Sequence, residues 1–140
     1  MPRYATVKVV VGTVLRKNGR FLLVQDKKQV AKQKWTFPAG RAEVNHTIEQ
    51  CAVREAFEES GFRIKLVKKL FVYHEGLDHP VRHAFLGKIV GGHLNFPKKE
   101  ILNAGWFTFK EIQKMYRENK IRHHWVFQAL QLVHGEIKKH

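Results

Sequence analysis

The chain has 140 residues, of which 44% are hydrophobic, and a formal net charge of +14. This length and apolar content allow one domain, residues 1–140, to bury a core, and they exclude a disordered polypeptide. The single cysteine, Cys51, excludes an intramolecular disulfide and favours a reducing compartment. No apolar run is long enough for a signal peptide or a membrane span, so we expect a cytoplasmic protein that does not enter a membrane.

The positive charge comes from 26 Lys and Arg against 12 Asp and Glu. A basic surface can attract polyanions such as nucleotides, RNA or polyphosphate, or it can serve only to keep a protein in solution. The basic residues are scattered over 27–34, 63–69, 98–99 and the tail 137–140 rather than gathered in one arm. Both interpretations therefore stay open.

In chain order, residues 6–26 predict two strands joined at Asn18-Gly19, because Asn-Gly suits the positive φ angles of a tight hairpin turn. Residues 32–45, which hold a Pro and a Gly close together, predict a loop-rich stretch. A capping box of Thr47 and Gln50 predicts a helix that begins at Thr47, and Gly61 is placed to end it.

The second half of the chain predicts strands at 62–75 and 82–92, with a further short strand at 93–96. Residues 106–119 begin as a strand and become a helix capped by Thr108, with Glu111 completing a second capping box. Residues 123–139 predict a last amphipathic helix. Strands mixed with a few helices predict a sheet covered by helices.

The expected helix at 47–61 carries a concentration of acid in this basic protein. Glu55, Glu58 and Glu59 have helical spacing and share one face, while Ala52, Val53, Ala56 and Phe57 form an apolar arc that can pack on the sheet. Such a helix can be an ordinary solvated amphipathic helix. Grouped carboxylates with no lysine among them also suit a divalent cation such as Mg²⁺ or Mn²⁺.

Residues 40–62, "GRAEVNHTIEQCAVREAFEESGF", resemble the signature box of the Nudix hydrolases. The resemblance extends to the hairpin before the box, to "KWTFPAG" and to "EILNAGWFTFKEI" after it. One position departs, because His46 stands where the family pattern has its first glutamate. The matching positions are Gly40, Arg54, Glu55, Glu58, Glu59 and Gly61.

The resemblance implies an α/β/α sandwich with a mixed central sheet, of the α/β (α+β) class. It also implies cleavage of a pyrophosphate linkage in a nucleoside diphosphate derivative by metal-activated water. Glu55, Glu58 and Glu59 would hold Mg²⁺ or Mn²⁺, with the Gly40 carbonyl as a further ligand. Arg54 would pair with glutamates of the box and orient them. The general base would be a glutamate of the box or an acid in a later loop, for which Glu100 is the candidate.

Other residues carry two interpretations each. Trp35 could stack on a base or pack in the core, and Arg41 and Lys34 could touch phosphates or remain solvated. Glu43 could contact the residues that bind the metal without binding the metal itself. His74, His79 and His83 match no standard zinc spacing and fit surface or loop positions better. Cys51 fits a small, partly buried residue rather than a nucleophile.

Three functions remain possible at this stage. The first is a Mg²⁺-dependent hydrolase of small nucleotides or other diphosphates, such as nucleoside triphosphates or dinucleoside polyphosphates. The second removes pyrophosphate from RNA 5′ ends, which the positive charge would assist. The third is a nucleotide- or RNA-binding module with weak catalysis, for which His46 is the sequence feature. A homodimer would be in keeping with the family, but the chain does not specify its oligomeric state or its substrate.

Overall fold

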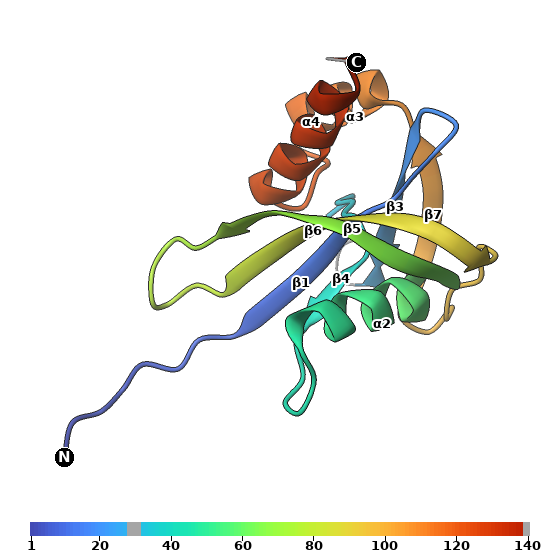
Figure 1. The fold of residues 1–140 in the computed structure, drawn as a ribbon. Coiled ribbons are helices and arrows are strands. Elements are labelled where there is room, and N and C mark those ends of the chain that lie inside the picture. Colours follow the sequence, from blue (N-terminus) through green and yellow to red (C-terminus); the bar gives the residue numbers. More distant parts are fainter. Residues whose placement is uncertain (28–31, 139–140) are drawn as a thin grey trace.

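The structure, a computed structural model, describes residues 1–27 and 32–138 (Figure 1). Three helices are described, α2 (Ile48–Ser60), α3 (Phe109–Arg117) and α4 (His124–Lys138). The strands are β1 (Val9–Val14), β2 (Arg16–Lys17), β3 (Arg20–Asp26), β4 (Ala39–Arg41), β5 (Phe62–Tyr73), β6 (Val81–Gly92) and β7 (Ile101–Phe107). Residues 1–8 run away from the body of the protein as an extended segment (Figure 1).

The strands form two sheets. One has the order β4-β1-β6-β5, in which β1 and β6 are parallel and the other pairs are antiparallel. The other is antiparallel, with the order β2-β3-β7. In β1 and β3, six-residue and seven-residue runs rich in Val, Leu and Phe are largely buried, which is typical of strands covered on both faces.

Helices cover both faces of the mixed sheet (Figure 1). Helix α2 packs on β1, β4 and β5 from one side, and α4 packs on β1, β5 and β6 from the other, with α3 against α4. The largest core cluster joins the sheet to α3 and α4 through side chains such as Phe37, Trp125 and Leu130. A smaller one joins it to α2 through Ala52 and its neighbours. The α+β class, with a mixed sheet between helices, is thus confirmed.

The local signals of the sequence have the expected geometry. Thr47 and Gln50 form a complete capping box, and Gly61 ends α2 with a φ of 83°. Thr108 and Glu111 cap α3 in the same way. Asn18 and Gly19 have φ angles of 52° and 75° between β2 and β3. Each signal depends on a few neighbouring residues, which is why the sequence alone predicts it.

Four expectations about the strands and the buried faces are wrong. Residues 93–96 are not a strand, because the Asn95 N–H donates to the Ser60 carbonyl at 2.8 Å and is held by the end of α2. Strand β7 begins at Ile101, ahead of Trp106, because its whole length pairs with β3. Phe57 is 51% exposed, since about 100° of helical rotation separates it from buried Ala56. His83 is buried in β6 and lies on no surface loop.

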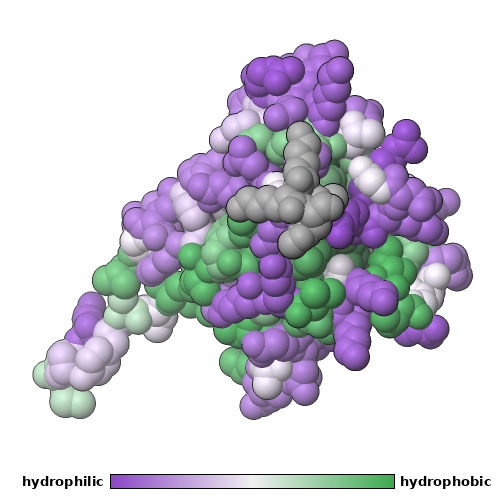
Figure 2. Space-filling model, turned by 45° about the horizontal axis from the view of Figure 1, so that its top comes forward, coloured by the Kyte–Doolittle hydropathy of each residue, from purple (hydrophilic) through white to green (hydrophobic). Residues whose placement is uncertain are grey.

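The face in Figure 2 is mainly hydrophilic, with apolar side chains reaching the surface in patches between polar ones. Two of the basic stretches, 27–34 and 137–140, extend into residues 28–31 and 139–140, which lie outside the described residues, as does the expected last residue of α4. Within the described residues, none of the helices combines the length and the apolar character needed to traverse a lipid bilayer.

Candidate active site

Two glutamates of α2 lie against strand β4. The Glu59 carboxylate accepts a hydrogen bond from the Ala39 backbone N–H, with 2.7 Å between nitrogen and Oε1. At the next residue, Gly40, a Cβ atom would lie 2.2 Å from the carboxyl carbon of Glu55. Only glycine permits this approach of strand and carboxylate. The glycine and the glutamates of the signature box therefore meet because α2 packs on the short strand β4.

Both carboxyl groups have pKa values far above those of exposed glutamates. Burial first, and the charge of neighbouring Glu58 second, raise the pKa of Glu55 to about 7. Burial also raises the pKa of Glu59 to about 8, although the hydrogen bond from Ala39 opposes this rise. A cation bound between the two groups would favour their ionised forms.

Arg54 is held on the more exposed side of the same helix. Its guanidinium forms an ion pair with Glu43, and its Nε lies 3.2 Å from Glu58 Oε1 without hydrogen-bond geometry. The His46 Nε2 lies 3.4 Å from its NH1 atom. His46, which replaces a glutamate of the family pattern, thus contacts the arginine rather than Glu55 or Glu59.

The residues present fit a divalent metal, with fewer side chains than expected. Within residues 1–27 and 32–138, no three His, Cys, Asp or Glu side chains stand together in a group that could hold a metal ion. Glu58 is half exposed and paired with Arg54, so the expected cage of three glutamates is not assembled. Mg²⁺ commonly binds one or two carboxylates and completes its shell with water and substrate phosphates. Glu55, Glu59 and Gly40 suit that pattern.

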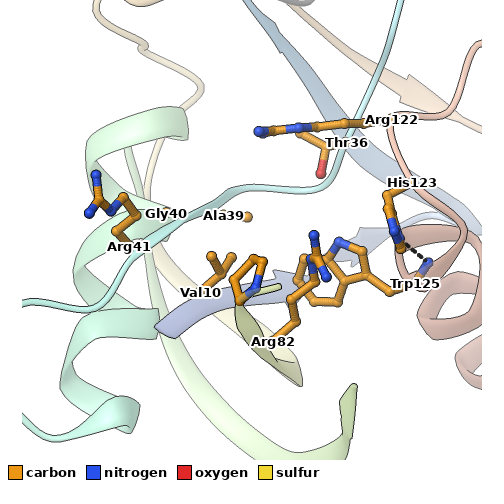
Figure 3. A pocket seen from close by; sticks show the side chains of 10 residues that line it. Val10, Thr36, Ala39, Gly40, Arg41, Arg82, Arg122, His123 and Trp125 are labelled. Carbon is orange, nitrogen blue, oxygen red and sulfur yellow. Dashed lines mark hydrogen bonds between the residues drawn. The ribbon is translucent and has the colours of Figure 1, made fainter. Parts of the chain in front are cut away.

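A cleft of about 200 Å³ borders the same two residues of β4. Three arginines from different parts of the chain border it, with the Arg41 side chain directed away from the other lining residues. Figure 3 shows Arg122 extending into the cleft from one side, Arg82 approaching from β6, and Arg41 near α2. Guanidinium groups bind phosphate oxygens through paired hydrogen bonds. The full lining is Val10, Thr36, Ala39, Gly40, Arg41, Pro80, Arg82, Arg122, His123 and Trp125.

Glu75 connects two residues of the cleft. Its Oε1 lies 3.5 Å from the Arg82 NH1 and 3.1 Å from the His123 Nε2. The other ring nitrogen of His123 accepts a hydrogen bond from the Trp125 N–H at 3.1 Å. Burial, reinforced by the Arg82 cation, lowers the pKa of His123. The lowered pKa favours the neutral imidazole, and the contacts of both ring nitrogens fix the orientation of the ring in the cleft.

Arg122 links the cleft to the carboxylates, because its charge lowers the pKa of Glu59 in part. Arg122 also has a fixed backbone. Its N–H donates to the Trp35 carbonyl at 2.9 Å, and the Trp35 N–H donates to the Lys120 carbonyl at 2.8 Å. The Lys34 ammonium donates to both the carbonyl and the side-chain oxygen of Asn119, at 2.6 and 2.7 Å. The chain segment before β4 is thus bound to the segment before α4.

The structure brings only some of the expected substrate residues to the cleft. Arg41 lines it. Trp35 instead packs edge-on against Phe107, with 5.0 Å between ring centroids, and Lys34 is engaged by Asn119. Glu43 contacts Arg54, and Glu100 lines a separate surface hollow that Glu58 also lines.

Four residues of the cleft that the sequence did not indicate are Arg82, Arg122, His123 and Trp125. Arg82 is adjacent to His83 in a strand, and strand alternation could have placed the two on opposite faces. The run Arg122-His123-His124 stands just before an amphipathic helix, where polar residues are ordinary. No local spacing signal connects these residues with the box.

The family model of the NUDIX domain matches residues 6–129. The human protein 8-oxo-dGDP phosphatase NUDT18 is 32% identical over 118 residues, which cover 82% of this chain and 36% of the human protein. The NAD-capped RNA hydrolase NudC of Pectobacterium carotovorum subsp. carotovorum is 29% identical over 112 residues, which cover 80% of this chain and 43% of that protein. The chain thus spans about two fifths of the length of these curated relatives.

A solved NUDIX hydrolase from Nitrosomonas europaea has the same fold, with a TM-score of 0.75 and 30% sequence identity, covering 91% of this chain and 70% of that one. The family match spans the glutamates of α2, strand β4 and the start of α4, which together form the candidate site. The chain belongs to the NUDIX family.

Proposed function

We propose that the protein is a Mg²⁺- or Mn²⁺-dependent hydrolase that cleaves the pyrophosphate bond of a nucleoside diphosphate derivative. One observation carries the proposal. Glu55 and Glu59, with pKa values of about 7 and 8, contact the two residues of β4 that also border a cleft with three arginines. Acidic ligands for a cation thus lie beside cationic ligands for phosphate.

In this proposal Glu55, Glu59 and the Gly40 carbonyl hold the metal. When bound, the metal supplies positive charge that neutralises the phosphate oxygens and promotes deprotonation of the attacking water. Arg41, Arg82 and Arg122 hold the phosphates and keep the reacting phosphorus in place. Arg54 pairs with Glu43 and Glu58 and orients them on the more exposed side of α2. Water adds to one phosphorus, the bridging P–O bond breaks, and a carboxylate accepts the released proton.

Four carboxylates are candidates for that proton acceptor. Glu55 and Glu59 have pKa values near neutrality when no metal is bound, but they serve as metal ligands here. Glu58 and Glu100 are more exposed, and both line the surface hollow at α2. The proposal assigns the base to Glu58 or Glu100, because a group that binds the metal is less free to accept a proton.

The test is a screen of nucleoside triphosphates, dinucleoside polyphosphates, ADP-ribose and NAD. The products of pyrophosphate cleavage are detected in Mg²⁺ and in excess chelator. Hydrolysis of at least one diphosphate compound that stops in chelator and returns with Mg²⁺ or Mn²⁺ supports the proposal. Turnover that continues undiminished in chelator rejects it.

A second candidate function, removal of groups from RNA 5′ ends, is supported by the net charge of +14 and by the name of the relative NudC, an NAD-capped RNA hydrolase. The comparison of an RNA bearing a 5′ diphosphate-linked group with the same group as a free nucleotide separates this function from the first. A third candidate, a binding module with weak catalysis, is supported by His46, which contacts Arg54 without adding a negative charge.

A further inference from the structure

A second surface hollow, of about 930 Å³, lies beside the glutamates of α2. It shares no lining residue with the arginine-bearing cleft. Glu58 and Glu100 form its acidic side. The other residues that bear on its chemistry are Phe57, Arg63, His93, Asn95 and Phe96.

Close backbone packing fixes the shape of this hollow. At Gly61, which has a φ of 83°, a Cβ atom would lie 2.4 Å from the His93 carbonyl oxygen and 2.6 Å from that of Asn95. The Asn95 N–H also donates to the Ser60 carbonyl. At Gly91 a Cβ would lie 2.6 Å from the guanidinium of Arg63, so that side chain lies directly over the strand. The rim is therefore formed before any ligand arrives.

The lining combines aromatic faces with hydrogen-bonding groups. Phe57 is 51% exposed although it lies in a helix that packs on the sheet, and Phe96 is partly exposed nearby. Arg63, His93 and Asn95 add donors and acceptors around the two rings. Exposed phenylalanines among polar groups suit a flat ring that carries its own hydrogen-bonding atoms, such as a nucleobase.

The carboxylates of α2 and Glu100 are associated with both cavities. Glu55 touches Gly40, which lines the cleft, while Glu58 and Glu100, which both raise the pKa of Glu55, line the hollow. A diphosphate held at the carboxylates would thus lie next to both cavities. Because the two cavities differ in charge, the two ends would meet different surroundings.

We propose that this hollow binds an aromatic ring attached to the far side of the scissile diphosphate, so that the substrate carries an organic group at both ends. This inference rests on the proposed function, and it adds a binding site formed by Phe57 and Phe96. A substrate with a base at each end would use both cavities, whereas a substrate with a single base places a ring in only one of them.

The experiment compares two substrates that share an adenosine diphosphate half. Diadenosine diphosphate carries a second base, and ADP-ribose ends in a sugar. With Mg²⁺ present, kcat/KM should be about tenfold higher for diadenosine diphosphate, because stacking of one base on an aromatic side chain is of this order. Equal kcat/KM values, or a preference for ADP-ribose, would contradict the assignment.

Variants then locate the preference. Phe57→Ala and Phe96→Ala should each lower the ratio of the two kcat/KM values by about tenfold. Val72→Ala is the matched control, because it also removes a half-exposed apolar side chain, 47% exposed, and lies on β5 in neither cavity. Since Phe57 and Phe96 are both partly exposed, the variants should fold, and their thermal unfolding is recorded alongside.

Binding without catalysis gives a readout that does not depend on the metal-loaded enzyme. In excess chelator, calorimetric titration should give a Kd for diadenosine diphosphate about tenfold lower than that for ADP-ribose, and Phe57→Ala should remove this difference. If no diphosphate is hydrolysed, the proposed function fails, and this titration alone decides the assignment of the hollow. A difference that persists in both phenylalanine variants overturns the assignment.

Discussion

The Glu59 carboxylate accepts a hydrogen bond from the Ala39 backbone N–H at 2.7 Å, so the last turn of α2 is tied directly to strand β4. The carboxylate thereby serves two purposes, because the same group is proposed to bind the metal. We expect Glu59→Gln to lower kcat by about 10²-fold or more and to raise the Mg²⁺ concentration for half-maximal activity, the order of losing a metal ligand or its partners.

The amide of the glutamine keeps an oxygen for the Ala39 N–H, so the fold should be retained. Glu118→Gln is the control, because Glu118 lies at the C-terminal end of α3 and faces neither the cleft nor the hollow. Steady-state kinetics across a Mg²⁺ titration measures both effects. An unchanged kcat in Glu59→Gln would remove Glu59 from the site.

The raised pKa values of Glu55 and Glu59 predict how pH acts on the metal-free protein. Both groups bind a proton more tightly in the folded state than an ordinary glutamate, so their contribution to stability is fully present below about pH 4.5 and is lost as pH rises through about 7 and 8. In chelator, the urea midpoint of unfolding should therefore fall between these limits.

Glu59→Gln should flatten this fall, because it removes the group with the higher pKa, and Glu118→Gln should leave the fall unchanged. Mg²⁺ should raise the midpoint most at the alkaline end, where the carboxylates are ionised. A metal-free midpoint that fell equally in wild type and Glu59→Gln would show that the buried carboxyl is not the cause.

Substitutions at His46 test the one position at which the sequence departs from the family signature box. A glutamate at 46 would pair with Arg54, which His46 Nε2 now approaches at 3.4 Å, and would draw the arginine from Glu58. We expect His46→Glu to lower the Mg²⁺ concentration for half-maximal activity, by up to about tenfold, and to keep or raise kcat. His46→Ala should have little effect. A loss of activity in both variants would give His46 a chemical role of its own.

Arg122 is the cleft residue whose charge reaches Glu59. Arg122→Ala should raise KM for diphosphate substrates by about 10- to 100-fold, the order of one charge-assisted hydrogen bond, with a smaller change in kcat. Arg117→Ala, which removes an arginine from the last turn of α3, is the matched control. If kcat falls and KM stays constant, Arg122 acts on the reacting phosphate rather than on binding.

Salt separates the two interpretations of the net charge. If the basic surface attracts substrate, kcat/KM should fall as salt rises while kcat changes little, because screening weakens the encounter. The fall should be steeper for a 5′-modified RNA than for a mononucleotide, since the basic side chains neutralise more phosphates of the RNA. A salt response that is flat for every substrate would assign the charge to keeping the protein in solution.

The parts of the site that the sequence predicted are the local ones. The capping box at Thr47, the end at Gly61 and the shared face of the glutamates all follow from residues within a few turns of one helix. Helical periodicity could not tell which edge of that face meets β4. The structure places Glu55 and Glu59 there and leaves Glu58 with Arg54.

The cleft was beyond prediction because it depends on long-range register. Arg82 reaches it through the parallel pairing of β1 with β6, which sets Val10 opposite Arg82. Arg122 reaches it through the bridge between Trp35 and Ile121. Neither of these pairings can be predicted from the spacing of residues in the sequence. Phe57 was misplaced for a related reason, since its position at the margin of the helix face can be buried or exposed depending on the neighbouring loop.

The hydrogen bonds between the segments before β4 and before α4 also constrain how loop lengths can vary. Trp35 fixes Arg122 through its backbone, and only four positions further on Ala39 meets Glu59. An insertion between these two attachment points would change the separation of the arginine from the carboxylates while leaving both chemistries intact. Relatives could therefore diverge in the length of substrate they accept through this short segment alone.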